Sequence, residues 1–157
     1  MDGKVEARLK DLGVVLPDAP TPVANYVPSL IIGDLLFISG QISMGADGEI
    51  ITGQLGSEVS VDQGQAAAKR CAIFILAQTK AAVGSLDRVT QVVKLTGFVN
   101  ATADFGNHPK VINGASDFMV EVFGDKGRHT RAAVGVSSLP MNCAVEVDAI
   151  LRIEQKI

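Results

Sequence analysis

The chain has 157 residues, of which 47% are hydrophobic and 20% charged, and its formal net charge is −3. This length suits one domain, and so apolar a chain is not a disordered one. The longest aliphatic run, residues 71–77, is far shorter than the ~20 residues of a membrane-spanning helix. Residues 1–10 mix charges with no apolar stretch, so no signal peptide is expected. We predict a soluble, cytoplasmic domain with more apolar surface than a monomer hides, and therefore an oligomer.

Nucleic-acid and metal binding fit the composition poorly. The chain is acidic and has few clustered Lys or Arg residues, whereas nucleic-acid-binding domains usually carry a basic face. It has no Trp and one Tyr, so it has few aromatic rings on which bases could stack. The cysteines, Cys71 and Cys143, lie far apart without metal or redox spacing. We interpret both as small buried hydrophobic residues.

The N-terminal part of the chain predicts a helix and a hairpin. Apolar residues recur at helical spacing over residues 3–12, and a glycine follows. Residues 17–22 contain three prolines and are expected to be extended. Two β-rich runs, 27–32 and 35–39, are separated by Gly33-Asp34, which predicts a hairpin with a two-residue turn.

The middle of the chain predicts a glycine-rich loop, a long helix and a strand. The loop covers residues 44–56, with a short strand expected at 49–52. Ser60 and Gln63 have the S-x-x-Q form of a capping box, which predicts the start of a helix that ends at Gly84. Residues 89–99 are rich in Val and Thr and predict a strand.

The last third predicts a helix over residues 109–123 and strands over 131–136 and 144–153. The final strand alternates apolar and polar residues, as expected when one face of a strand is buried. The order ββ(β)αβαββ indicates an α+β fold with a mixed sheet. Because two helices cover only one face of such a sheet, we expect the other face to be buried by a further copy of the chain.

The candidate chemistry rests on Arg131 and Glu146, because the common nucleophile, phosphate-loop and zinc motifs are absent from the sequence. Arg131 opens an otherwise uncharged strand, and Glu146 lies on the polar face of the following strand. An unpaired buried guanidinium is costly, and two interpretations are open. Arg131 and Glu146 form a structural ion pair, or Arg131 awaits a carboxylate ligand while Glu146 holds a water molecule.

The two histidines differ in what their positions suggest. His108 precedes a proline at a predicted helix start and is interpreted as a surface or capping residue. His129 lies two residues before Arg131, so it shares the face of Arg131 if the strand begins early. We therefore include His129 among the candidate substrate-binding residues.

Two C-terminal segments, RAAVGVSSLP at residues 131–140 and AVEVDAI at residues 144–150, closely resemble the signature of the RidA (YjgF, endoribonuclease L-PSP) family. Ser39-Gly40-Gln41 resembles the family's S-G-Q strand end, and Tyr26 and Asn113 also match. The resemblance covers roughly residues 24–153 and points to the longer branch of the family. It divides the chain into an N-terminal helix and proline-rich extension, residues 1–23, and a RidA-like domain, residues 24–157.

The resemblance implies a chorismate-mutase-like fold in a homotrimer with pockets between subunits. It also implies hydrolysis of reactive enamines and imines, such as 2-aminoacrylate and 2-iminopropanoate, to 2-keto acids and ammonia, with no metal or organic cofactor. Arg131 would bind the substrate carboxylate, Glu146 would orient the attacking water, and the backbone of Ala133 would contact substrate or water. The residues implied to line the pocket are Ser39, Gly40, Tyr26 and Asn113.

Several positions depart from the family pattern, and they bear on pocket size and preferred substrate. Ala133 stands where Cys is usual, and Ser116 where a Tyr is expected after the asparagine. Arg128-His129 replaces Phe-Pro, and Ala24-Asn25 replaces Gly-Pro before Tyr26. The alternative to a deaminase is a regulatory trimer that binds small carboxylates without chemistry. Ribonuclease activity, which the older family name suggests, fits an acidic chain poorly.

Overall fold

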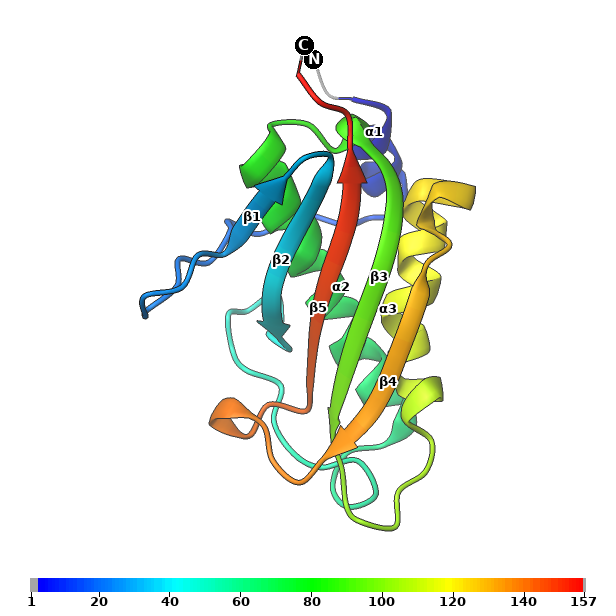
Figure 1. Ribbon diagram of the computed structural model, residues 1–157. Coiled ribbons are helices and arrows are strands. Elements are labelled where there is room, and N and C mark those ends of the chain that lie inside the picture. The colour runs from blue at the N-terminus through cyan, green and yellow to red at the C-terminus, as the bar shows by residue number, and fades with distance from the viewer. Residues whose placement is uncertain (1–2, 157) are drawn as a thin grey trace.

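The computed structural model describes residues 3–156. These residues form an α+β structure whose elements are shown in Figure 1. The elements are α1 (Lys4–Asp11), β1 (Ser29–Ile32), β2 (Leu35–Ile42), α2 (Val61–Val83), η1 (Leu86–Arg88), β3 (Val89–Asn100), α3 (His108–Phe123), η2 (Gly124–Gly127), β4 (Thr130–Val136), η3 (Pro140–Asn142) and β5 (Val145–Ile153).

The five strands form one mixed sheet in the order β1-β2-β5-β3-β4. Strands β3 and β4 are parallel, and the other neighbours are antiparallel. Helices α2 and α3 lie side by side on the same face of the sheet, as Figure 1 shows. The predicted α+β class, mixed sheet and one-sided helical layer are confirmed.

Local signals in the sequence explain most element boundaries. Ile32 pairs with Leu35, so Gly33-Asp34 forms the predicted two-residue turn, with Gly33 at a φ of 62°. The side chain of Ser60 accepts a hydrogen bond from the Gln63 amide and the Gln63 side chain accepts one from the Ser60 amide, at 3.1 and 2.8 Å. The predicted capping box is therefore confirmed.

The short strand expected at residues 49–52 is wrong. This segment makes only isolated bridges, from Ile50 to Met44 and from Thr52 to Cys143. Gly48 and Gly53 flank it with φ angles of 83° and 116°. These left-handed turns leave too few extended residues between them for a ladder.

The two faces of the sheet differ sharply in burial. The helix-covered face carries the hydrophobic core, including the fully buried Leu95 and Leu151. On the opposite face, Ile32 is 61% exposed and Val134 is 44% exposed. The expectation that one face of the sheet stays uncovered within a single chain is confirmed.

The N-terminal helix packs onto the rest of the domain. Leu9 is buried in the core, and the backbone amides of Lys4 and Val5 donate to the Asp87 carboxylate at 2.9 and 2.8 Å. The division into an extension at residues 1–23 and a domain at residues 24–157 stays a prediction. Within residues 3–156, every helix is too short or too polar to cross a bilayer.

Both cysteines are buried and unbonded to each other, which confirms their interpretation as core residues. Burial raises the pKa of the Cys143 thiol to about 11. Burial likewise raises the pKa of the Cys71 thiol well above its ordinary value. Because only a thiolate is a strong nucleophile, neither side chain is suited to covalent chemistry.

Candidate active site

A β-bulge in β2 creates the first part of the site. Ile38 pairs with Ala149 and Gln41 with Val147, so β2 has one residue more than β5 between these pairs. Such bulges re-aim strands beside functional sites. The bulge brings Gly40 against Glu146, where an added Cβ would lie 2.9 Å from the carboxylate Oε1. A glycine at this position therefore leaves room for the carboxylate.

Ser39, the other bulge residue, fixes the chain that leads into β1. Its hydroxyl donates to the Val27 carbonyl at 2.7 Å, and its amide donates to the Pro28 carbonyl at 3.0 Å. These bonds hold the segment that carries Tyr26 beside the end of β2. The sequence motif at residues 39–41 thus acts mainly through backbone geometry.

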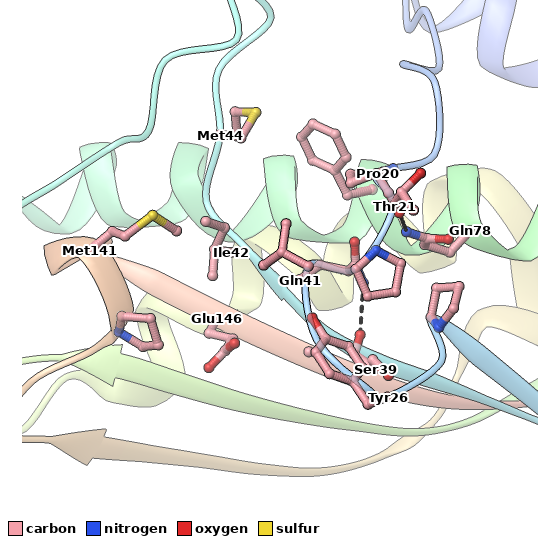
Figure 2. Close-up of a pocket in the computed structure, with 16 residues that line it drawn as sticks. Pro20, Thr21, Tyr26, Ser39, Gln41, Ile42, Met44, Gln78, Met141 and Glu146 are labelled. Atoms are coloured by element: carbon pink, nitrogen blue, oxygen red, sulfur yellow. Dashed lines mark hydrogen bonds between the residues drawn. The ribbon is translucent and has the colours of Figure 1, made fainter.

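Tyr26, Ser39, Gly40 and Glu146 line one pocket of about 390 Å³. We call these four residues the carboxylate half-site. Figure 2 shows Tyr26, Ser39 and Glu146 gathered in the lower part of the view, with Met44 above and Met141 to the left. The structure brings four of the predicted site residues together here.

The Glu146 carboxyl is half-buried at the edge of this pocket. Burial, together with the nearby Asp148 carboxylate, raises the pKa of Glu146 above its ordinary value of 4.5. A carboxylate with a raised pKa is a better proton acceptor near neutral pH. Glu146 therefore has the chemistry of a general base.

A second cluster forms where β4 meets α3. Arg131 Nη1 donates to Asn113 Oδ1 at 2.8 Å and to Ser116 Oγ at 3.2 Å. Both partners are neutral and lie on α3, one turn apart. They leave the other guanidinium nitrogens of Arg131 able to take a carboxylate in a bidentate contact.

His129 extends this cluster with a directed chain of hydrogen bonds. Its Nδ1 lies 2.6 Å from the Gly127 carbonyl, and its Nε2 lies 2.8 Å from Ser116 Oγ. A carbonyl only accepts, so Nδ1 carries the proton. In the neutral ring, Nε2 then accepts a hydrogen bond from the Ser116 hydroxyl. The oxygen of the same hydroxyl accepts a hydrogen bond from Arg131 Nη1. His129 lies just before β4, which begins at Thr130, and it meets Arg131 through their shared hydrogen-bond partner Ser116.

Ala133 lies two residues after Arg131, on the same face of β4. It is in register with Gly97 of β3 and packs against the core. Side chains are small here because α3 lies close, and a Cβ at Gly97 would overlap Ile112. We call Asn113, Ser116, His129, Arg131 and Ala133 the guanidinium half-site.

The predicted ion pair between Arg131 and Glu146 is wrong. Arg131 is in register with Leu95, which faces the helices, whereas Glu146 is in register with Phe98 on the open face. Strand β3 also separates β4 from β5. The ion pairs within residues 3–156 are Arg128–Asp125 and Arg152–Asp34. The two half-sites thus occupy opposite faces of one chain.

Comparison with known proteins identifies the family. The family model described as "YjgF/chorismate_mutase-like, putative endoribonuclease" matches residues 6–151. The chain belongs to the YjgF/RidA family. Membership confirms the expected chorismate-mutase-like fold, and family members include imine deaminases.

Individual relatives cover nearly the whole chain. This chain is 48% identical over 152 residues to Protein TCP17 of Trypanosoma cruzi, and the matched region covers 96% of this chain and 95% of that protein. It is 29% identical over 139 residues to a 2-iminobutanoate/2-iminopropanoate deaminase of Dermatophagoides farinae, covering 88% and 93%. The crystal structure of the protein Atu1372, of unknown function, from Agrobacterium tumefaciens matches with a TM-score of 0.88 at 48% identity, covering 96% and 94%.

In this YjgF/RidA protein, three contributors to the guanidinium half-site and to the pocket beside Glu146 are absent from the residues predicted to form the site. Ser116 stands out in the sequence only as a departure from the family pattern, although a hydroxyl three residues after Asn113 shares its helix face. Gln78 also contributes, and a large amide amid the apolar residues of α2 is a signal that could have identified it. Residues 20–23 line the pocket, although their prolines predict only an extended chain.

The residues of both half-sites are poor metal ligands as a set. Within residues 3–156, His, Cys, Asp and Glu side chains form no group of three that could hold a metal ion. The arrangement can instead bind a carboxylate at the guanidinium half-site and accept a proton at the carboxylate half-site.

Proposed function

We propose that this protein is an imine/enamine deaminase that hydrolyses 2-imino acids to 2-keto acids and ammonia. The observation that carries the proposal is the state of Arg131, a half-buried guanidinium held by two neutral side chains. A buried cation without a fixed anion favours an anionic ligand. The deaminase relative supports the same chemistry.

We also propose that the working enzyme is a homotrimer whose sites lie between copies. The half-sites lie on opposite faces of the sheet, so one chain cannot bring Arg131 to Glu146. A head-to-tail arrangement around a threefold axis would place the guanidinium half-site of one copy against the carboxylate half-site of the next. It would also bury the exposed apolar side chains of the open sheet face, such as Ile32 and Val134.

For this reaction the protein needs mainly to position the substrate and the attacking water molecule. An enamine must first tautomerise to the imine, whose C2 is already electrophilic. Arg131 holds the substrate carboxylate while Glu146 accepts a proton from water as the water oxygen bonds to C2. The C=N electron pair moves to nitrogen, which takes up a proton. In the resulting carbinolamine the hydroxyl proton passes to the nitrogen, the C=O bond forms as the C–N bond breaks, and the 2-keto acid and ammonia leave.

Imine lifetime in a coupled assay tests this proposal. A D-amino-acid oxidase generates 2-iminopropanoate from D-alanine, and semicarbazide traps the imine that remains. We expect wild-type protein to remove the imine, and Arg131→Ala and Glu146→Gln to lower kcat/KM at least about a hundredfold. Arg128→Ala, in an exposed ion pair, is the matched control and should keep wild-type activity.

Two results would contradict a deaminase. One is absence of imine removal by wild-type protein, and the other is full activity in Arg131→Ala. If 2-keto acids bound at Arg131 without faster imine hydrolysis, the regulatory, carboxylate-binding trimer would be favoured instead. Ribonuclease activity, named in the family description, fits less well because the net charge of −3 repels phosphate.

A further inference from the structure

The pocket beside Glu146 is larger and more apolar than a three-carbon substrate needs. At about 390 Å³ it has the volume of about a dozen waters at ~30 Å³ each. The imine derived from alanine has only about half that number of non-hydrogen atoms. Beyond Glu146 most of the lining side chains are apolar and come from four parts of the chain; they include Val23, Ile42, Met44, Phe74 and Met141.

One wall is the proline-rich extension, held in place from α2. The buried Gln78 side chain, 3% exposed, donates from Nε2 to the Pro20 carbonyl at 2.9 Å. Figure 2 shows Gln78 beside Pro20 and Thr21 at this side of the pocket. Prolines restrict the segment further. This wall of the pocket is therefore fixed by the contact of the extension with α2.

The opposite wall is Met141, presented by an unusual turn. Met141 and Asn142 have φ angles of 54° and 56°, a left-handed conformation that non-glycine residues rarely adopt. The buried Asn100 holds the turn, donating from Nδ2 to Asn142 Oδ1 and to the Cys143 carbonyl, both at 3.1 Å. Strained turns of this kind cluster at ligand sites. The thioether side chain of Met141 can adapt to apolar groups of varied shape.

We infer that this site prefers 2-imino acids with large apolar side chains, of the leucine, methionine or phenylalanine type, over the three-carbon imine. The inference rests on the proposed deaminase function and names its substrate class. With the substrate carboxylate at Arg131 of a neighbouring copy and its C2 at Glu146, the substrate side chain would extend into the apolar part of the pocket between Met44 and Met141. Each methylene buried there adds about fourfold to kcat/KM.

Competing imines in the oxidase assay test the preference. The leucine-derived imine has three more carbons than the alanine-derived imine, so its kcat/KM should be about ten to sixty times higher. Met141→Ala should lower this ratio several-fold. Val15→Ala, an exposed apolar residue outside the pocket lining, is the matched control and should leave the ratio unchanged.

Failure of the preference is distinguishable from failure of the deaminase proposal. If both imines were hydrolysed and the alanine-derived imine reacted as fast or faster, the preference would be overturned while the activity stood. If neither imine were hydrolysed, calorimetry with the corresponding 2-keto acids would decide the preference. Tighter binding of 4-methyl-2-oxopentanoate than of pyruvate would support it, and equal or weaker binding would overturn it.

Discussion

Replacing Gly40 by alanine tests the position of the Glu146 carboxylate with one methyl group. The added Cβ would lie 2.9 Å from Oε1 and 3.1 Å from Cδ of Glu146, where ordinary contacts begin at 3.4 Å. The carboxylate must therefore move by at least about half an ångström. A displacement of ~1 Å costs roughly a hundredfold in rate, so we expect Gly40→Ala to lower kcat/KM about tenfold.

The same substitution should hardly affect stability. Gly40 is exposed, and the group it would meet is the end of a side chain that can rotate away. We therefore expect the free energy of unfolding to change by less than about 0.5 kcal/mol, measured by urea denaturation alongside the imine assay. Gly106→Ala is the matched control, because a Cβ there points into open space. Full activity in Gly40→Ala, or equal loss in Gly106→Ala, would refute the role given to the Glu146 position.

Two further predictions concern titration and the hydrogen-bond chain. Because its pKa is raised in the folded protein, Glu146 destabilises the folded state as pH rises through that pKa. Glu146→Gln should therefore raise Tm at neutral pH by about 1–3 °C. Scanning calorimetry should show that this gain in Tm vanishes below pH 4.5, the ordinary pKa of a glutamate. A lower Tm of Glu146→Gln at neutral pH would contradict this prediction. Ser116→Ala removes the hydroxyl that accepts a hydrogen bond from Arg131 and donates one to His129. The substitution should therefore raise KM three- to tenfold with little change in kcat. Ser116→Thr should restore KM, and an unchanged KM in Ser116→Ala would show that the hydroxyl does not position Arg131.

Most elements of the fold are predictable because their signals are local. The Gly33-Asp34 turn and the Ser60 capping box each lie within a few residues of the structure they specify. The regular alternation of β5 likewise reports which side chains are buried. The strand expected at residues 49–52 failed because flanking glycines in left-handed conformations outweighed local β preference.

The pairing of Arg131 with Glu146 failed for a non-local reason. Arg131 and Glu146 lie on strands that follow each other in the chain, which suggests that the two strands are neighbours in the sheet and that the two side chains can meet. The structure keeps them apart because β3 lies between β4 and β5. In addition, α3 packs closely on β4, so Arg131 and the small residues face the helix while Val134 faces the open side. Only the sheet order reveals which face a strand of this kind presents.

Mixing two inactive variants tests most directly whether active sites form between copies of the chain. Arg131→Ala lacks the guanidinium half-site function, and Glu146→Gln lacks the carboxylate half-site function. After refolding together in equal amounts, a shared site receives an intact Arg131 half the time and an intact Glu146 half the time. Imine hydrolysis should then recover to about one quarter of the wild-type rate, as expected for random mixing around a symmetric ring. Sites built within single chains would show no recovery at any mixing ratio.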